Sequence, residues 1–388
     1  MNCDYFDAGS CRSCTLLETP YAVQLAQKQE EARGLLAPFG EVQWLQPLAS
    51  SEESFRNKAK IVVGGSADQP TLGIIDRAGR GIDLRRCNLY DPAITAALPV
   101  LDELIRAASL TPYDVPKRKG ELKNILVTVS ANGELMIRLV LRSKKLIVPI
   151  RSRLHWLYER LPNLAVVSVN LLREHVALVE GPEEIILSER TTLPMQVNDL
   201  TLHLRPQSFF QTNTEIAAGL YLQGQEWVRQ ASPASLWDLY CGVGGFALHA
   251  AQVLPASSEV TGIELSGEAI ESARRTVAEY GLANLEFFAG DATDFALRQG
   301  TVPEMVVVNP PRRGIGHELA TWIEESGIEK FIYSSCNAKS LAKDLESMPS
   351  LKPVKARLVD MFPHTTHYET IVLLQRSSLG GMILSHGK

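Results

Sequence analysis

The sequence of 388 residues predicts an α/β protein whose C-terminal half, from about residue 205, forms a parallel sheet with helices on both faces. Two observations predict this fold class: short apolar runs alternate with helical patterns, and several of those runs end in glycine-rich or polar segments. The composition, 45% hydrophobic and 21% charged, is ordinary for a globular protein with a sizeable core. No stretch of 18 uncharged apolar residues occurs, so no transmembrane helix is predicted.

The chain divides into four predicted parts. In order, they are a segment with a cysteine cluster (1–90), a central mixed α/β domain (91–204), the domain of the parallel sheet (205–375) and a loose tail (376–388). Strand patterns in the first two parts occur at 58–65, 71–77, 124–130, 134–143, 165–172 and 175–181, with one helix pattern at 98–110. The segment Ala131-Asn132-Gly133 is a hairpin signal, and a second strand pair is expected to turn around Arg173 and Glu174.

The C-terminal half repeats a rhythm of strand, turn and helix. The expected strands are 235–240, 258–265, 284–290, 304–311, 330–335 and 369–375, and helices are expected at 246–254 and 266–281. Ligands of such sheets bind at the carboxyl ends of the strands. We therefore expect the functional residues of this chain at those ends.

The N-terminus carries a cysteine cluster. Cys3, Cys11 and Cys14 lie in a segment that has neither the basic nor the apolar region of a secretory signal, and Cys87 follows at a distance. The six cysteines of the chain are too few and too unevenly placed for a disulfide framework. The cluster therefore predicts a metal site in a cytoplasmic protein.

The net charge of −5 conceals a basic stretch. Between Pro112 and Arg153 there are ten Lys and Arg against three Asp and Glu, so this stretch carries +7 and the rest of the chain carries −12. A positive face on an acidic body can steer a phosphate backbone. Charges that are balanced in space would explain the composition equally well.

The first strand of the C-terminal half leads into a glycine loop, Asp238-Leu-Tyr-Cys-Gly242-Val-Gly244-Gly245-Phe246. Glycines here allow a tight turn and a close approach of a ligand to the backbone. The next strand ends in Glu264, a carboxylate placed to accept hydrogen bonds from ribose hydroxyls. A nicotinamide dinucleotide and S-adenosylmethionine both fit this pattern, and Asp238 favours the second because it can bind the ammonium end of a methionine moiety. A strand–helix turn without a ligand is the third interpretation.

Two further strands end in polar segments. Asn309-Pro-Pro-Arg312-Arg313 forms a rigid extended loop, because consecutive prolines continue neither a helix nor a sheet. Enzymes that methylate exocyclic amines have an aromatic residue in the place of Arg312, which argues against an amine target and leaves phosphate binding open. Cys336 follows the next strand and is a candidate nucleophile, although a lone cysteine is commonly inert. Glu369, which opens the last strand, is a candidate general base or an exposed strand residue.

Together and in this order, four segments resemble the RNA uracil-C5 methyltransferase family: Trp237-Asp-Leu-Tyr-Cys-Gly-Val-Gly-Gly, Asn309-Pro-Pro-Arg-Arg-Gly, Ser335-Cys336-Asn337 and His367-Tyr-Glu369. The resemblance extends from Met1 to about Gln375 and includes the cysteine cluster, which is similar to that of the iron–sulfur members. Within the family it is closest to the members that act on uracil 747 of 23S ribosomal RNA. It implies a Rossmann-like, S-adenosylmethionine-dependent methyltransferase domain from residue 205.

The resemblance also implies the roles of individual residues. Cys336 would add to C6 of uracil so that C5 becomes nucleophilic, and Glu369 would remove the C5 proton after methyl transfer. The residues assigned to the methyl donor are Gln211, Tyr240, Glu264 and Asn309, with Asp238 and Gly242 in the glycine loop and Asp291 near the adenine. The target base must leave its stack, so an aromatic or apolar lining is also expected.

The cysteine cluster has two candidate ligands. Four thiolates can bind zinc or an iron–sulfur cluster. Zinc ribbons usually carry two Cys-x2-Cys pairs, whereas Cys3, Cys11, Cys14 and Cys87 provide one pair and two single cysteines, which slightly favours iron–sulfur. The resemblance implies a [4Fe-4S] cluster that ties Cys87 to the N-terminal loop and shapes an RNA-binding surface.

Three alternatives stay open at this point. An NAD-dependent iron–sulfur oxidoreductase would use the same loop and cluster, and a non-catalytic RNA-binding protein would need only the basic stretch. The same chemistry on tRNA or on another ribosomal uridine is the nearest alternative. The expected partner is 23S ribosomal RNA, and the sequence indicates neither a membrane nor an obligate protein partner.

Overall fold

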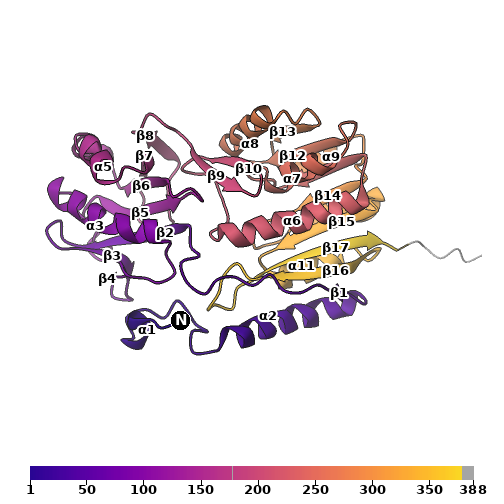
Figure 1. Ribbon diagram of the computed structural model, residues 1–388, viewed down its shortest axis with the longest axis horizontal. Coiled ribbons are helices and arrows are strands. Elements are labelled where there is room, and N and C mark those ends of the chain that lie inside the picture. Colours follow the sequence, from indigo (N-terminus) through magenta and orange to yellow (C-terminus); the bar gives the residue numbers. More distant parts are fainter. Residues whose placement is uncertain (177, 378–388) are drawn as a thin grey trace, which may run out of the picture.

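Two large sheets organise the protein, one in each of two lobes that lie side by side (Figure 1). The computed structural model describes residues 1–176 and 178–377. The C-terminal lobe contains an eight-stranded sheet, and the other lobe contains a seven-stranded sheet. An antiparallel pair, β9 (Leu193–Val197) and β10 (Leu200–Leu204), lies between them (Figure 1).

The eight-stranded sheet has the order β1-β16-β17-β15-β14-β11-β12-β13. Its strands are β1 (Gln43–Trp44), β11 (Ser235–Leu239), β12 (Glu259–Glu264), β13 (Leu285–Ala289), β14 (Met305–Val308), β15 (Lys330–Ser335), β16 (Leu351–Val359) and β17 (Glu369–Arg376). Strands β11 to β15 are parallel as predicted, but β17 runs antiparallel to both of its neighbours. The prediction of an entirely parallel sheet was wrong at this edge, because the short turn 360–368 returns the chain directly beside β16 and holds no crossover helix.

Helices cover both faces of this sheet, as predicted. Alternate strand residues face opposite sides: Met305 and Val307 belong to one core cluster, and Val306 and Val308 belong to the other. The first cluster includes residues of α6 (Thr214–Ala231), α7 (Gly245–Val253) and α8 (Gly267–Tyr280). The second includes residues of α2 (Tyr21–Leu36), α9 (Ala292–Arg298), α10 (Gly316–Ser326) and α11 (Ala338–Glu346).

The seven-stranded sheet has the order β4-β3-β2-β5-β6-β7-β8. Its strands are β2 (Lys58–Gly65), β3 (Pro70–Ile75), β4 (Gly81–Asp83), β5 (Leu122–Val129), β6 (Leu135–Leu141), β7 (Leu164–Leu171) and β8 (Glu183–Ile186). The predicted hairpin is present as β5 and β6. The helices of this region are α3 (Pro92–Ala107), α4 (Ile147–Arg151), α5 (Leu154–Arg160) and the 3-10 turn η2 (Lys144–Leu146).

In the second strand pair predicted for this region, the first strand (165–172) is present as β7, but the strand predicted at 175–181 was wrong. The strand β7 pairs with β8, which comes after the expected strand 175–181, and none of the described residues in 175–181 is in a strand. Residue 177 lies outside the described residues. The side chain of Asn170 in β7 binds both the N–H and the carbonyl of Gly181, so at Gly181 a side chain takes the hydrogen bonds that a strand ladder would use.

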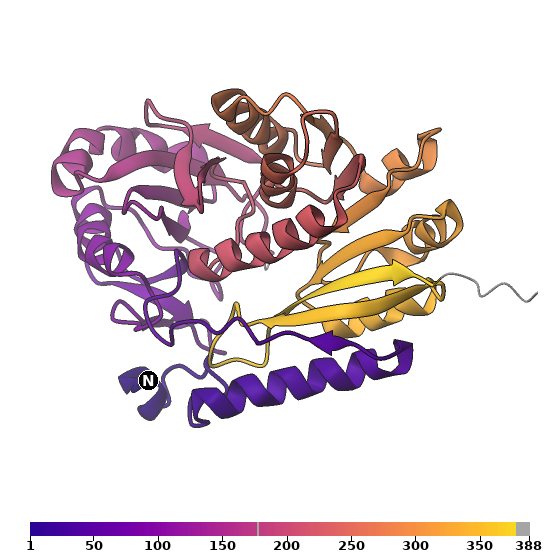
Figure 2. The ribbon, with the colours of Figure 1, turned by 45° about the vertical axis from the view of Figure 1, so that its right-hand side comes forward.

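The first 90 residues contribute to both lobes. After α1 (Asp4–Asp7), helix α2, the 3-10 turn η1 (Ala37–Phe39) and β1 lie along β16 and β17, while β2, β3 and β4 belong to the other sheet (Figure 2). The domain boundaries at residues 90 and 204 stay predictions. The boundary at 90 does not coincide with a division between the two sheets, because strands before it belong to both sheets.

Two further predictions concern the ends of the chain and the membrane. The loose tail predicted for 376–388 lies outside the described residues from 378 onward, and β17 extends to Arg376. In the described part of the chain, no helix combines the length and the apolarity that crossing a bilayer requires.

Candidate active site

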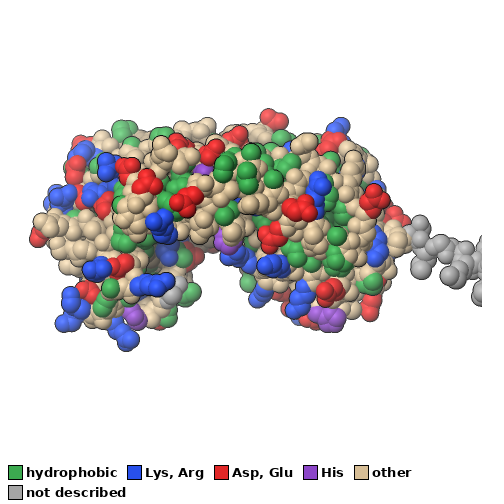
Figure 3. Space-filling model, turned by 90° about the horizontal axis from the view of Figure 1, so that it is seen from below, with side chains coloured by type: hydrophobic (Ala, Val, Ile, Leu, Met, Phe, Trp, Pro, Cys, Tyr) green, Lys and Arg blue, Asp and Glu red, His purple; other side chains and the backbone are tan. Residues whose placement is uncertain are grey.

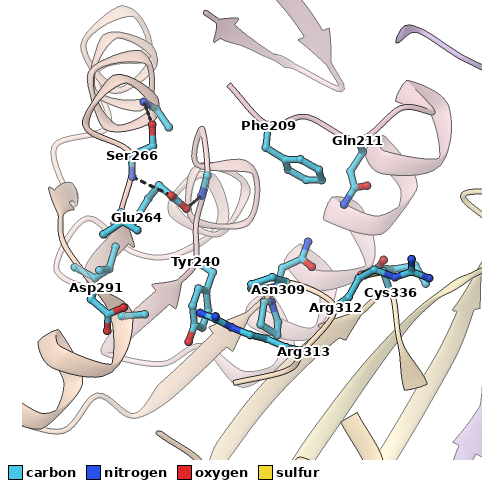
Figure 4. A pocket seen from close by; sticks show the side chains of 18 of the residues that line it. Phe209, Gln211, Tyr240, Glu264, Ser266, Asp291, Asn309, Arg312, Arg313 and Cys336 are labelled. Carbon is cyan, nitrogen blue, oxygen red and sulfur yellow. Dashed lines mark hydrogen bonds between the residues drawn. The ribbon is translucent and has the colours of Figure 1, made fainter. Parts of the chain in front are cut away.

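A cavity of about 790 Å³ opens where strands β11, β12, β14 and β15 end. This volume is typical of a site that encloses a small molecule. Eight of the nine residues predicted for catalysis and donor binding line it: Gln211, Tyr240, Gly242, Glu264, Asp291, Asn309, Cys336 and Glu369. Figure 4 shows Glu264 and Asp291 at one end, Cys336 and Gln211 at the other, and Tyr240 and Asn309 between them.

The glycine loop that follows β11 has an unusual backbone. Gly242 and Gly244 adopt φ angles of 57° and 90°, and Tyr240 adopts 68°, a conformation that costs a non-glycine residue about 1–3 kcal/mol. Such strain persists only where the surrounding structure enforces it. Here it places the Tyr240 side chain and the Gly242 backbone along the cavity, at the entry to helix α7.

Two carboxylates fix the loops at the same end of the cavity. Glu264 accepts hydrogen bonds from the N–H groups of Gly242 at 3.2 Å and Ser266 at 3.0 Å, so it joins the glycine loop to the start of α8 (Figure 4). Asp291 caps α9 by accepting from the N–H groups of Thr293 and Asp294. Carboxylate oxygens accept more than one hydrogen bond, so both groups remain able to bind hydroxyl or amino donors of a ligand.

Asp238 is the predicted residue that does not line the cavity. It lies beneath the glycine loop with no exposed surface, and its Oδ2 accepts a hydrogen bond from the N–H of Ala247 at 2.9 Å. Burial raises the pKa of this carboxyl to about 8. Its Oδ1 has no hydrogen-bond partner among the described residues. Asp238 thus holds the start of α7, and its contact with a methionine ammonium group stays a prediction.

Cys336 and Glu369 lie at the opposite end of the cavity, Cys336 directly after β15 and Glu369 at the start of the neighbouring strand β17. Glu369 is 1% exposed, and its Oε1 accepts a hydrogen bond from the Ser334 hydroxyl at 2.7 Å. Burial raises the pKa of Glu369 to about 7. Burial also raises the pKa of Cys336, the nearby Glu369 carboxylate raises it further, and the Arg312 guanidinium lowers it. A thiol and a carboxyl with a pKa near neutrality therefore occur together, and their roles as nucleophile and base stay predictions.

Arg312 and His367 form a pair that the sequence did not reveal. Arg312 Nη2 lies 3.0 Å from His367 Nδ1, and both residues line the cavity with Cys336. The amide of Asn337 donates to the Arg312 carbonyl at 2.9 Å. Burial and the positive charges of Arg312 and Lys28 lower the pKa of His367, so its ring stays neutral and accepts from the guanidinium. The Arg312 side chain thus lies near the Cys336 thiol, and phosphate binding by Arg312 stays a prediction.

Aromatic side chains complete the lining, as expected for a site that receives a base. Phe209 lines the cavity and is 72% exposed, and Phe362 lines it from the turn before β17. The sequence did not identify Phe209, because nothing in the pair Phe209-Phe210 shows which of the two side chains is exposed.

The four clustered cysteines lie at the junction of the N-terminal segment and the chain around Cys87. Burial and repulsion by Cys87, Cys11 and Cys3 raise the pKa of Cys14 to about 11, which indicates that the four thiols are close to one another. Hydrogen bonds tie the two segments together, from the Arg86 N–H to the Tyr5 hydroxyl and from the Asn88 amide to the Asn2 carbonyl.

This donor set was compared with the two expected ligands. In the part of the chain that the structure describes, no three Cys, His, Asp or Glu side chains converge as the ligands of a single metal ion would. In a [4Fe-4S] cluster each thiolate binds a different iron, so the four sulfurs stand farther apart than around one ion. Four neighbouring thiols suit either ligand as donors, and the choice of a [4Fe-4S] cluster stays a prediction.

Comparison with known proteins identifies the family. The family model described as tRNA (Uracil-5-)-methyltransferase matches residues 20–377. The chain belongs to this family. The predicted resemblance is thereby confirmed, and the uracil-5-methyltransferase family leaves no support for a dinucleotide-dependent oxidoreductase or a non-catalytic RNA-binding protein.

Relatives in the uracil-5-methyltransferase family match this chain over nearly its full length. The 23S rRNA (uracil(747)-C(5))-methyltransferase RlmC of Halothiobacillus neapolitanus is 50% identical over 380 residues, which are 97% of this chain and 100% of the relative. The enzyme of the same name from Serratia proteamaculans is 47% identical over 378 residues, again 97% and 100%.

A solved structure shows the same fold. The tRNA (uracil-54, C5)-methyltransferase of Pyrococcus abyssi, solved in complex with S-adenosyl-L-homocysteine, has a TM-score of 0.77 at 22% identity, and the match covers 93% of this chain and 85% of that one. The expected methyltransferase fold is therefore confirmed.

Proposed function

We propose that this chain transfers the methyl group of S-adenosylmethionine to C5 of one uridine in 23S ribosomal RNA, at the position that its relatives name as uracil 747. The observation that carries the proposal is the arrangement of one cavity, with Cys336 at one end and Glu264 beside the glycine loop at the other. Glu369 lines the same cavity and is close enough to Cys336 to raise the pKa of its thiol. This arrangement supports the proposal because it offers a nucleophile for uracil C6, a base for the C5 proton and space for a donor within one cavity.

The reaction follows from these side chains. The Cys336 thiolate adds to C6 of the flipped uracil, and the electron pair displaced from the C5–C6 bond makes C5 nucleophilic. C5 attacks the sulfonium methyl group, the S–CH3 bond breaks and S-adenosylhomocysteine leaves. Glu369 then removes the C5 proton, so that the C6–S bond breaks, the ring double bond is restored and the Cys336 thiolate is released. Because the pKa of Glu369 is about 7, its carboxylate is available at neutral pH and accepts the proton readily.

The other end of the cavity suits the donor. In this proposal Glu264 accepts hydrogen bonds from the ribose hydroxyls and Asp291 accepts from the adenine amino group, which is supported by their place in the lining, while the Gly242 backbone permits a close approach. Tyr240 and Asn309 lie between this end and Cys336, where the methyl group must pass, and Gln211 lies at the end that holds Cys336. Their contacts with the donor are part of the proposal.

We also propose that Cys3, Cys11, Cys14 and Cys87 hold a [4Fe-4S] cluster. The cluster would join the N-terminal loop to the segment around Cys87 and would supply no electron to the methyl transfer, which is not a redox reaction. Protein purified without oxygen is expected to contain about four iron atoms per chain, and Cys87→Ser is expected to lose them. Wild-type protein that contains zinc or no metal would contradict this assignment.

The function is tested by mapping 5-methyluridine in rRNA and tRNA from cells with and without the gene. Loss of one 23S methyluridine, with the tRNA modification intact, is the expected result. Loss from tRNA alone would keep the chemistry and overturn the substrate, and no loss at any position would overturn the function.

The mechanism is tested with purified variants and an RNA fragment that contains the site. Cys336→Ala is expected to abolish methylation, and Glu369→Gln to accumulate a covalent protein–RNA adduct that survives denaturing gels. The double variant Cys336→Ala/Glu369→Gln is the control, because it retains the altered base but has no thiol to form the adduct. Methylation by Cys336→Ala at the wild-type rate would contradict the mechanism.

A further inference from the structure

The turn between β16 and β17, residues 360–368, brings two side chains to the catalytic end of the cavity. Phe362 and His367 both line the cavity, and the turn leads directly into Glu369. Glu369 is also fixed by the pairing of β17 with both neighbouring strands and by Ser334. His367 lies outside these ladders, so its position depends on what holds the turn.

Helix α2 holds this turn at its midpoint through Gln24. The side chain of Gln24 is fully buried, and its amide donates to the carbonyls of Leu16 at 2.9 Å and Thr19 at 2.8 Å. Its Oε1 accepts a hydrogen bond from the N–H of His364 at 2.9 Å. His364 has a φ of 63°, a strained value for a non-glycine residue, so the turn needs an outside partner to keep this shape. The N–H of Leu16 also donates to the His364 carbonyl at 2.9 Å.

The second contact of α2 is a buried ion pair. Lys28 is 3% exposed, and its Nζ binds Asp360 Oδ1 at 2.7 Å and the Phe362 carbonyl at 3.1 Å. Asp360 has no exposed surface. Gln24 and Lys28 are four residues apart and so lie on the same face of α2. Their contacts fix positions 360, 362 and 364 of the β16–β17 turn. Figure 2 shows α2 running along the β16–β17 hairpin.

These contacts lead to the nucleophile in two steps. His367 accepts a hydrogen bond from the Arg312 guanidinium, and that guanidinium stabilises the Cys336 thiolate. Lys28 contributes a second effect, because its charge helps to keep the His367 ring neutral and therefore able to accept. A displaced turn would move His367 away and release the Arg312 side chain toward solvent.

We infer that Gln24 and Lys28 are positioning residues for the reaction, and that they act by holding turn 360–368 so that His367 keeps Arg312 beside Cys336. The inference rests on the proposed function only in naming Cys336 as the nucleophile. It assigns to the N-terminal helix a direct part in setting the reactivity of a cysteine that lies more than 300 residues later in the chain.

The test measures the reactivity of the Cys336 thiol in the full-length protein without RNA. The rate of alkylation of Cys336 by iodoacetamide is followed against pH by mass spectrometry of the Cys336 peptide, which separates it from the other cysteines. In Gln24→Ala and Lys28→Met the Arg312 charge is no longer held in place, so alkylation at pH 8 is expected to slow about three- to tenfold, with the profile moved to higher pH. The direct variant His367→Ala is expected to show the same shift.

The matched control is Gln27→Ala, which makes the same change on an exposed position of the same helix and should leave the profile unchanged. Thermal denaturation of every variant identifies unfolded protein. If Lys28→Met unfolds because Asp360 is left as an unpaired buried charge, Lys28→Met/Asp360→Asn removes both charges and is tested in its place.

The outcomes separate the inference from the proposed function. Folded Gln24→Ala and Lys28→Met proteins whose alkylation profiles match the wild type would overturn the inference even if the wild type methylates rRNA. Shifted profiles would support the inference about the thiol. They would support it even if the wild-type protein methylated no RNA, a result that would overturn only the proposed function.

Discussion

The surroundings of Glu369 suit a single step of the proposed reaction. Its carboxyl is buried, receives one hydrogen bond from Ser334, and has its pKa raised to about 7. An ordinary glutamate, with a pKa of about 4.3, would be a far weaker base. Burial thus supplies proton affinity, and the Ser334 hydroxyl keeps the rise within a range in which the carboxylate is still present at neutral pH.

The pH dependence of adduct breakdown follows from this pKa. Above pH 7 Glu369 is ionised and accepts the C5 proton, and below pH 7 it is protonated and cannot, so breakdown of the covalent adduct should slow as the pH falls through about 7. Ser334→Ala removes a hydrogen bond that lowers this pKa, so the midpoint should move to higher pH. The measurement is a pH jump on adduct formed at pH 8, followed on denaturing gels.

The control for this experiment is Ser335→Ala, because the Ser335 hydroxyl bonds to the Asn337 carbonyl at 3.0 Å and makes no bond to Glu369. Its midpoint should stay near that of the wild type. Breakdown that does not change between pH 5.5 and 8.5 would assign the proton to another acceptor.

At the residue scale, the sequence identified the polar residues at strand ends but not the pairs that they form. Cys336, Asn309 and Glu264 could be found because the order of strands and loops fixes which segments meet at one edge. The Arg312–His367 bond joins residues 55 positions apart through a turn whose shape depends on α2. No local pattern encodes such a contact.

At the scale of elements, the glycine loop makes two neighbouring glycines differ in their expected effects. A Cβ added to Gly244 would lie 2.6 Å from Phe287 Cζ, whereas a Cβ added to Gly242 would meet nothing within 4 Å because it faces the cavity. Gly244→Ala combines a positive φ with this clash and should lower the free energy of unfolding by about 2–4 kcal/mol. Gly242→Ala should lower it by only about 1–2 kcal/mol but should weaken S-adenosylmethionine binding, because its methyl group enters the donor space.

Urea denaturation measures the free energy of unfolding, and calorimetric titration measures the affinity for S-adenosylmethionine. Gly267→Ala serves as the control, since an added Cβ there also meets nothing within 4 Å and its φ is not positive. Wild-type donor affinity in a folded Gly242→Ala protein would mean that the donor does not lie against this loop.

The elements that the sequence predicted are those whose apolar pattern matches their final surroundings. Strands β11, β14 and β15 are buried on both faces and are nearly continuous apolar runs, so the sequence predicted them. The sequence also predicted β12 and the edge strand β13, which are partly exposed. The direction of β17 and the position of β8 were not predicted, because each depends on a distant partner: the β16 edge in the first case and the Asn170 side chain in the second. Helix α2 has only four fully buried positions, two of them polar, and gave no clear amphipathic pattern.

For the whole molecule, the structure changes the meaning of the basic stretch 112–153. Five of its ten cationic side chains are in ion pairs: Lys117, Arg138, Arg142, Lys144 and Lys145. Among the described residues, no ion pair includes the exposed Arg118, Lys119, Arg151 or Arg153. The charges are therefore partly balanced in space, and about four remain to attract a phosphate backbone. Figure 3 shows Lys and Arg side chains on both sides of the hollow between the lobes.

This difference predicts how RNA affinity depends on salt. Each phosphate contact contributes about 0.7–0.9 to the slope of log affinity against log salt concentration. Lys119→Gln removes an exposed charge without an ion pair, so it should weaken binding of the 23S fragment and reduce the slope by about 0.7–0.9. Lys117→Gln, two residues away, removes a charge already paired with Asp114 at 2.8 Å and should change the slope much less.

Filter binding between 50 and 300 mM salt provides the comparison, with S-adenosylmethionine affinity measured in both variants as the control for folding. Equal slopes for Lys119→Gln and the wild type would place the RNA on another face, and equal losses in both variants would show that RNA binding breaks the Lys117–Asp114 pair.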